Sequence, residues 1–215
     1  MNLLDKLRDT ASWPKRWRIS HGFGVHSPFA FDFITKVLRA HDTYYYAFPE
    51  IDLMCGRSQR SPRHGKTIFS ISDFEKEEAH MIFRILCCFR PEHIVNFGGG
   101  NEVSMVIYKR AMPDARVWRW SREDLNIIET DRPCVDIVHA ALEMNRGAIR
   151  ATLLKGIHQP AGRVVIFRNM YVPAVRKVWE EVTASVNFGM TFHDRFTGIF
   201  VALPHLPRQD YPMLL

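Results

Sequence analysis

"IVNFGGGN", residues 94–101, joins a short apolar run directly to three glycines. Such a run predicts a buried β-strand that turns tightly into a helix. Because Gly98, Gly99 and Gly100 lack a Cβ, the backbone can approach a ligand there, and the following helix offers free N–H groups at its N-terminus. The alternative is a tight turn that serves packing alone. Either interpretation predicts an α/β fold.

The sequence around this stretch alternates between strand and helix patterns. A helix before it is predicted by a capping box formed by Ser72 and Glu75. Alternation predicts a parallel sheet with right-handed crossovers, and the last two strands, joined by a short turn, predict an antiparallel hairpin at its edge. The expected strands cover 93–98, 115–120, 134–139, 163–167, 187–194 and 197–203, and the expected helices between the first five cover 101–112, 122–129, 142–156 and 172–185.

Residues 1–70 follow a different pattern. A charged amphipathic helix is expected over residues 2–9, and a second helix is expected where Ser27 can act as N-cap and Pro28 as the first helical residue. Phe29, Phe33, Val37 and Leu38 would form its apolar face. We therefore predict an N-terminal helical cap over 1–70 and one compact Rossmann-like domain over 71–215.

Composition excludes several classes of protein. Of the 215 residues, 47% are hydrophobic and 24% are charged, which is typical of a soluble globular protein. No apolar stretch approaches the roughly 20 residues that span a bilayer, and the charged start does not resemble a signal peptide, so we expect a cytoplasmic protein without a membrane partner. The four cysteines form no C-x-x-C pair, which predicts reduced core cysteines and no metal site.

The net charge of +6 would allow an acidic partner. "WPKRWRISH", residues 13–21, interleaves Trp with Lys and Arg, as nucleic-acid-binding surfaces often do. Basic residues elsewhere are mixed with acidic ones, and the Trp side chains could instead anchor an N-terminal helix to the body. Nucleic acid is therefore not the expected partner, and a basic nucleic-acid-binding module is the third hypothesis for function.

Spacing separates the nucleotide ligands that a glycine turn could serve. The glycines are not followed by Lys and then Ser or Thr, which excludes a P-loop. A dinucleotide fingerprint would need a small residue where Val103 stands and an acid near 118–120, where the chain has Trp118, Arg119 and Trp120. An NAD-binding site is therefore not expected.

Three further segments carry a resemblance to a known family. "HGFGVHSPFAF" (21–31), "TFHDRFTGIFV" (191–201) and "VWEEV" (178–182) resemble segments of a small bacterial branch of the class I S-adenosylmethionine-dependent methyltransferases. The resemblance covers nearly the whole chain and implies a Rossmann-like sheet that ends in a hairpin. In the family's numbering, the strand order would be 2-1-4-5-7-6, because the short interval between Trp120 and Cys134 leaves no room for edge strand 3.

The chain departs from this family at the acidic residues that hold the cofactor. Where the family has an acid at the first strand end, this chain has Asn96, and at the second it has Trp120 and Ser121, with Glu123 and Asp124 a few residues later. His139 and Ala140 replace an Asp-Gly pair, and Arg168 and Asn169 replace an Asp-Asp pair. A cofactor that still binds would use the strand ends, namely Asn96, Gly98, Gly99, Gly100, Trp120, Ser121, Glu123 and His139.

Loss of these acids weakens the case for catalysis. A charge-assisted hydrogen bond contributes about 1.5 to 3 kcal/mol, so losing two would weaken binding by about a hundred- to ten-thousandfold. Asn169 and His139 remain candidate catalytic residues, and His26 and His193 lie at predicted segment ends.

We therefore predict a methyltransferase-like protein with a decayed S-adenosylmethionine site and a non-catalytic binding or scaffolding role, with a protein partner or a second copy of itself. The alternative is an active S-adenosylmethionine-dependent methyltransferase with a rewired pocket and an unknown acceptor, in which Glu123 or Asp124 binds the ribose.

Overall fold

A seven-stranded sheet forms the centre of the computed structural model, which describes residues 3–40, 44–58, 75–97, 102–120, 131–139 and 146–215. The expected parallel part is formed by β1 (His93–Phe97), β2 (Arg116–Arg119), β3 (Cys134–Val138) and β4 (Arg163–Phe167). The expected hairpin consists of β5 (Met190–His193) and β6 (Gly198–Ala202), and β6 pairs antiparallel with β4. This arrangement is an α/β fold of Rossmann-like type.

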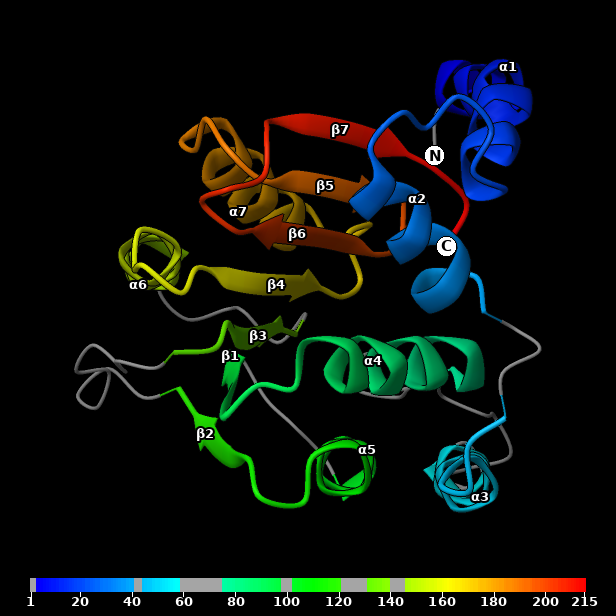
Figure 1. Cartoon of the computed structure of the whole chain (residues 1–215). Helices are drawn as coiled ribbons and strands as arrows, with labels where there is room; N and C mark the ends of the chain where they lie inside the picture. The colour runs from blue at the N-terminus through cyan, green and yellow to red at the C-terminus, as the bar shows by residue number, and fades with distance from the viewer. Residues whose placement is uncertain (1–2, 41–43, 59–74, 98–101, 121–130, 140–145) are drawn as a thin grey trace.

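The order of the strands is β2-β1-β3-β4-β6-β5-β7 (Figure 1). It differs from the predicted order, which ended at the strand over 187–194, because β7 (Gln209–Pro212) adds a parallel edge strand to β5. Residues 209–212, "QDYP", have no apolar alternation, and Asp and Pro are depleted in strands. The strand is held by tertiary contacts instead, since the Tyr211 ring stacks on Phe192 with centroids 5.2 Å apart.

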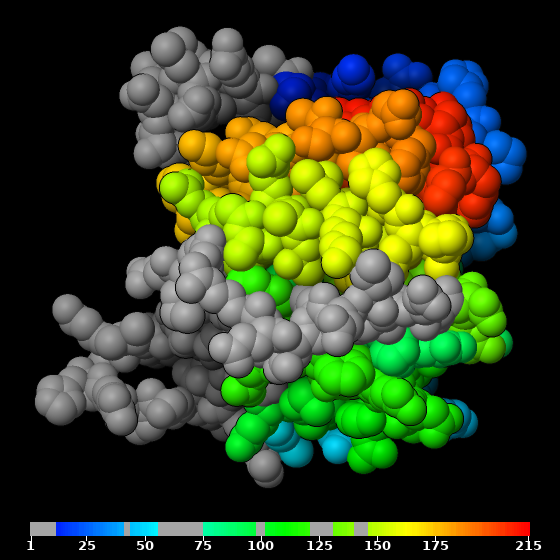
Figure 2. Space-filling model, turned by 90° about the vertical axis from the view of Figure 1, so that its left-hand side faces the viewer, coloured from blue at the N-terminus to red at the C-terminus, as the bar shows by residue number. Residues whose placement is uncertain are grey.

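Helices cover both faces of the sheet (Figure 1). The side chains of Ile94, Ile137 and Ile166 point to one face, where they share a core with α4 (Lys76–Phe89) and α5 (Glu102–Ala111). Val95 and Phe167 point to the opposite face, where they share a core with α6 (Arg146–Ile157) and α7 (Pro173–Ala184). Figure 2 shows α6 and α7 at the surface on this second side.

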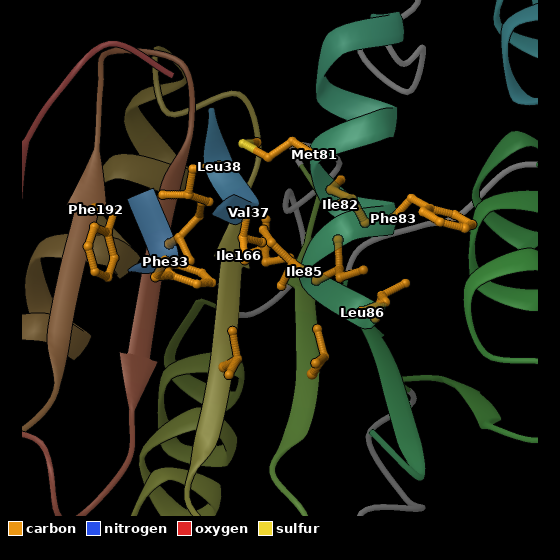
Figure 3. Packing of buried hydrophobic residues seen from close by; sticks show 14 of the residues in the cluster. Phe33, Val37, Leu38, Met81, Ile82, Phe83, Ile85, Leu86, Ile166 and Phe192 are labelled. Atoms are coloured by element: carbon orange, nitrogen blue, oxygen red, sulfur yellow. The ribbon is translucent and has the colours of Figure 1, made fainter. Parts of the chain in front are cut away.

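The N-terminal segments belong to the first of these two cores. Ser27 caps α2 (Pro28–Phe33) by accepting the Ala30 N–H at 3.3 Å, as predicted, and α2 continues into a π-helical turn, η1 (Ile34–Leu38). Figure 3 shows Val37 and Leu38 gathered with Ile166 and the side chains of α4. The buried Arg84 of α4 donates to the carbonyls of Val37 and Leu38 at 2.6 and 3.1 Å. α4 is thereby fastened to the end of η1.

Several local predictions need correction. α1 (Leu3–Ser20) runs well past the expected residue 9, and α3 (Phe48–Ser58) was not predicted. α4 begins at Lys76 with Glu75 extended as its N-cap, so Glu75 cannot be the third residue of a capping box; Ser72 lies outside the described residues. Cys88 is exposed, whereas Cys55 and Cys134 are buried thiols, and burial raises the pKa of both to about 11.

Candidate functional site

Three polar side chains meet at the carboxyl ends of neighbouring parallel strands. Asn96 lies in β1, His139 directly follows β3 and Arg168 directly follows β4. Asn96 pairs with Ile137, and Ile137 pairs with Ile166. Because side chains alternate along a strand, His139 and Arg168, two residues further on, point to the same face as Asn96. All three therefore face α4 and α5.

Arg168 is the most buried charged residue of this group, with an exposed fraction of 0%. Its Nε and Nη2 donate to the two carboxylate oxygens of Glu78 in α4, both at 2.8 Å. This two-bond geometry is the strongest form of the Arg–carboxylate pair. The positive charge of Arg168 is therefore balanced inside the protein by the carboxylate of Glu78.

His139 is held in one neutral tautomer. Arg168 Nη1 lies 3.0 Å from His139 Nδ1, and because a guanidinium can only donate, Nδ1 must be the acceptor. The proton is then on Nε2, which donates to Asn96 Oδ1 at 3.2 Å. Burial, followed by the Arg168 charge, lowers the pKa of His139 to about 3. Both ring nitrogens are engaged, so the predicted base at this position is not available to a substrate.

Asn96 completes the group with α5. Its Oδ1 also accepts the Tyr108 hydroxyl proton at 2.8 Å, and Tyr108 is fully buried. Burial raises the pKa of Tyr108 well above its ordinary value, so the phenol stays protonated and acts as a donor. A continuous chain of hydrogen bonds thus links α4, β4, β3, β1 and α5, and it is buried except at Glu78, which is partly exposed. We call it the strand-end network, and its members are Glu78, Arg168, His139, Asn96 and Tyr108.

Sequence reasoning did not identify Glu78 and Tyr108. Both lie on helices, and no spacing rule connects them with the strand ends. A signal exists for Glu78, because Ile82 and Ile85 lie four and seven residues further along α4 and are fully buried. A carboxylate on the core-facing stripe of a helix requires a buried partner.

The other predicted cofactor residues fall into two groups. Trp120 follows β2, and its ring centroid lies 5.8 Å from that of Phe97 at an interplanar angle of 28°. The backbone N–H of Trp120 donates to the Asn96 carbonyl at 2.8 Å. It therefore packs on the face opposite the strand-end network. Residues Gly98, Gly99, Gly100, Ser121, Glu123, Asp124 and Ala140 lie outside the described residues.

Asn169 directly follows Arg168, a member of the strand-end network. Its backbone is left-handed, with φ of +58°, a conformation that Asn tolerates better than most residues. The side-chain Nδ2 donates to the Tyr171 hydroxyl at 3.2 Å, and Oδ1 is buried with no hydrogen-bond partner within the described part of the chain. Tyr171 is exposed and its ring meets the exposed Phe196 edge-on at 6.2 Å.

The remaining histidine candidates have different surroundings. His26 is exposed. His193 Nε2 lies 3.1 Å from Asp210 Oδ1, and the Thr191 hydroxyl donates to the same oxygen at 2.6 Å. Burial opposes ionisation of Asp210, but these two hydrogen bonds, together with nearby charge that includes Arg208, lower the pKa of Asp210. The His193 contact therefore fastens β7 to β5.

Among the described residues, no group of three or more His, Cys, Asp and Glu side chains is arranged to hold a metal ion. No helix in the described ranges has both the length and the apolar character that crossing a membrane requires. Comparisons with protein-family models, curated proteins and solved structures gave no significant match.

Proposed function

We propose that this chain is a methyltransferase-like protein of the class I, S-adenosylmethionine-dependent type whose cofactor site has been replaced by the strand-end network, and that it serves as a non-catalytic binding or scaffolding protein. The observation that carries the proposal is the engagement of Asn96, His139 and Arg168 with one another and with Glu78. In the family that the sequence resembles, these three positions would carry the acids that receive the cofactor.

Charge supports this proposal. S-adenosylmethionine carries a sulfonium and an ammonium group, so its site needs carboxylates. At the three strand ends this chain supplies a carboxamide, a neutral imidazole and a guanidinium. The one carboxylate of the network, that of Glu78, already accepts a hydrogen bond from Arg168 on each of its two oxygens. A ligand that recruited Glu78 would leave the Arg168 cation buried without its partner, which costs several kcal/mol.

The surroundings of the strand ends suit a protein partner. Tyr171 and Phe196 are exposed by 53% and 46% at this end of the sheet. Arg195 lies over the Phe196 ring, with its Cζ 4.4 Å from the centroid. Tyr, Phe and Arg are enriched in protein–protein interfaces. The protein partner of the proposed scaffold would therefore bind at the carboxyl ends of the parallel strands, where an enzyme of this fold would bind its substrate.

The proposal is tested by binding of the cofactor and of its demethylated product. Purified protein is melted with and without millimolar S-adenosylmethionine or S-adenosylhomocysteine, and we expect the melting temperature to stay unchanged with either. A ligand at a hundred times its Kd adds about 2.7 kcal/mol, which for a domain of this size raises the melting temperature by roughly 5 to 11 °C. A saturable rise of that size, reproduced by equilibrium dialysis with labelled cofactor, would refute the proposal in favour of a rewired pocket.

A further inference from the structure

The two edges of the sheet differ in what they offer to a further strand. β7 forms one edge and β2 forms the other (Figure 1). The N–H groups of Gln209 and of Met213, just after β7, donate inward toward β5. The outward positions are therefore Asp210 and Pro212, and proline has no N–H to offer. The β7 edge is thus blunted in a way that is common for edge strands.

The β2 edge has backbone groups that are ready to pair. The N–H groups of Arg116 and Trp120 donate to carbonyls in and just before β1, at 2.9 and 2.8 Å. Because successive residues of a strand direct their N–H and C=O groups to opposite sides, Val117 and Arg119 direct theirs away from β1. Within the described ranges, no second strand pairs with β2. Both residues therefore present a donor and an acceptor at the outer edge.

The side chains of β2 give this edge a positive charge. Arg116 and Arg119 begin and end the strand, which contains no acidic residue. Both are exposed, and neither has an acidic partner among the residues that the structure describes. Glu92, just before β1, lies 3.8 Å from Arg132 instead. A strand placed beside β2 would therefore meet two cations that still lack a counter-charge.

The two residues between these cations are apolar. Val117 packs against the core on one face of the sheet, and Trp118, on the other face, is exposed by 38%. The Trp118 indole N–H donates to His93 Nδ1 at 3.0 Å, which holds the ring beside the strand. Side chains that lie opposite each other on paired strands interact directly. The complement of β2 is therefore acid–apolar–apolar–acid, a pattern that reads the same in a parallel or an antiparallel strand.

We infer that the outer edge of β2 binds an extended segment of a partner protein that has this acid–apolar–apolar–acid pattern, added to the sheet as a further strand. A strand of this kind satisfies the backbone groups of Val117 and Arg119, which a nucleic acid cannot do in the same register. A second copy of β2 is disfavoured, because antiparallel pairing would place Arg116 opposite Arg119. The two arginines thus repel basic strands and select acidic ones. The outer edge of β2 contains no member of the strand-end network.

The test uses a fluorescein-labelled peptide of about ten residues with Glu-Val-Tyr-Glu at its centre, and follows its fluorescence anisotropy at about 50 mM salt. We expect saturable binding, and Arg116→Ala/Arg119→Ala should raise the Kd by about two- to thirtyfold, because two cross-strand charge pairs are lost. Arg116→Glu/Arg119→Glu should reject this peptide and bind its counterpart with Lys-Val-Tyr-Lys. Arg146→Ala/Arg176→Ala, which removes two exposed arginines from α6 and α7, is the matched control and should bind normally.

Methylated peptides distinguish strand addition from attraction between charges alone. Methyl groups on one set of alternate backbone nitrogens remove the donors that face β2, and this peptide should not bind. The peptide methylated on the other alternate set should still bind. The inference is refuted if the two methylated peptides behave alike, or if the Arg→Glu variant does not change its preference. It is also refuted if no saturable binding occurs up to about 1 mM peptide, or if a thymidylate oligomer of equal charge competes as well as the unlabelled peptide.

Discussion

The carboxamide of Asn96 keeps the strand-end network electrically neutral. Glu78 and Arg168 cancel each other, and His139 is uncharged because burial and Arg168 lower its pKa to about 3. An acid at position 96 would add a buried negative charge with no further cation to balance it, which is costly in a low-dielectric interior. The absence of an acid at position 96 and the pairing of Arg168 with Glu78 are therefore physically connected.

Neutralising Glu78 should expose how strongly this pair supports the fold. We expect Glu78→Gln to lower the free energy of unfolding by about 3 to 5 kcal/mol, because the fully buried Arg168 cation loses its carboxylate. Urea denaturation with an unchanged m-value measures the loss. Glu77→Gln, at the exposed neighbouring position, is the control and should change little. The double variant Glu78→Gln/Arg168→Met should recover part of the stability, and a loss below about 1 kcal/mol in the single variant would contradict the assignment.

His139 should make stability depend on pH below neutrality. Its folded-state pKa is near 3, whereas an unfolded histidine titrates near 6.5, so only the unfolded chain takes up this proton between those values. Stability from this residue is complete above about pH 6.5 and is lost as the pH falls toward 3, with a slope of about 1.4 kcal/mol per pH unit.

Denaturant titrations from pH 7 to pH 4 compare the protein with His139→Asn. In the variant, the slope of the free energy of unfolding against pH should be smaller across this window by the contribution of about one proton. His26→Asn, at an exposed position, controls for the removal of a histidine as such. Equal slopes for the protein and His139→Asn would show that the imidazole is protonated in the fold.

The residues of the site were only half predictable. Asn96, His139 and Arg168 follow recognisable strands, so their positions could be read from the apolar runs before them. Their partners Glu78 and Tyr108 approach from helices, and only packing determines which helical residue reaches a given strand end. The sequence could therefore place the three strand-end residues, but it could not identify the two helical residues that complete the network.

At the scale of the elements, α6 packs closely against a second buried ion pair, formed by Arg163 and Asp136. Arg163, at the start of β4, directs Nη1 at both carboxylate oxygens of the fully buried Asp136, at 2.6 and 2.8 Å. The Arg163 guanidinium lies against Gly156 of α6, where a Cβ would collide with Nε and Cζ. The helix can approach β4 only because this position has no side chain.

Gly156→Ala should therefore destabilise the protein although Ala favours helices. The propensity gain of up to about 1 kcal/mol is outweighed by displacement of Arg163, and we expect a net loss of about 1 to 3 kcal/mol. Gly147→Ala, at an exposed position in the first turn of the same helix, should leave stability unchanged or slightly higher. Thermal unfolding of the two variants side by side decides the point, and equal melting temperatures would mean that Arg163 moves aside freely.

The predictable elements share one property. β1, β3 and β4 are short apolar runs bounded by breaks, and α7 has a strong apolar stripe, so local pattern and burial agree. β7 lacks any such pattern, and its position depends on Tyr211, Asp210 and the strand beside it. An edge strand whose position depends on pairing with residues about 18 positions earlier gives no local signal.

In the whole molecule, the two ends of the chain are fastened together. The Ser20 hydroxyl at the end of α1 accepts the Leu214 N–H at 2.8 Å and also lies 2.7 and 3.2 Å from the Arg16 and Leu214 carbonyls. Arg16 adds its contact to the Met213 carbonyl, and Met213 is fully buried. Residues separated by almost the entire sequence are thus hydrogen-bonded to one another. We therefore expect α1 and β7 to unfold locally as a single cooperative unit.

Ser20→Ala tests this coupling by native-state hydrogen exchange. Removal of the hydroxyl leaves the Leu214 N–H without its acceptor, which costs about 1 to 3 kcal/mol locally. We expect faster exchange in both the last turns of α1 and residues 209–215, by a similar factor, while β1, β3 and β4 keep their protection. Ser185→Ala, whose hydroxyl bonds to the Glu181 carbonyl within one helix, should affect neither end. Faster exchange in α1 alone would mean that β7 is held by β5 without the help of the N-terminal helix, and the ends would then be neighbours rather than one unit.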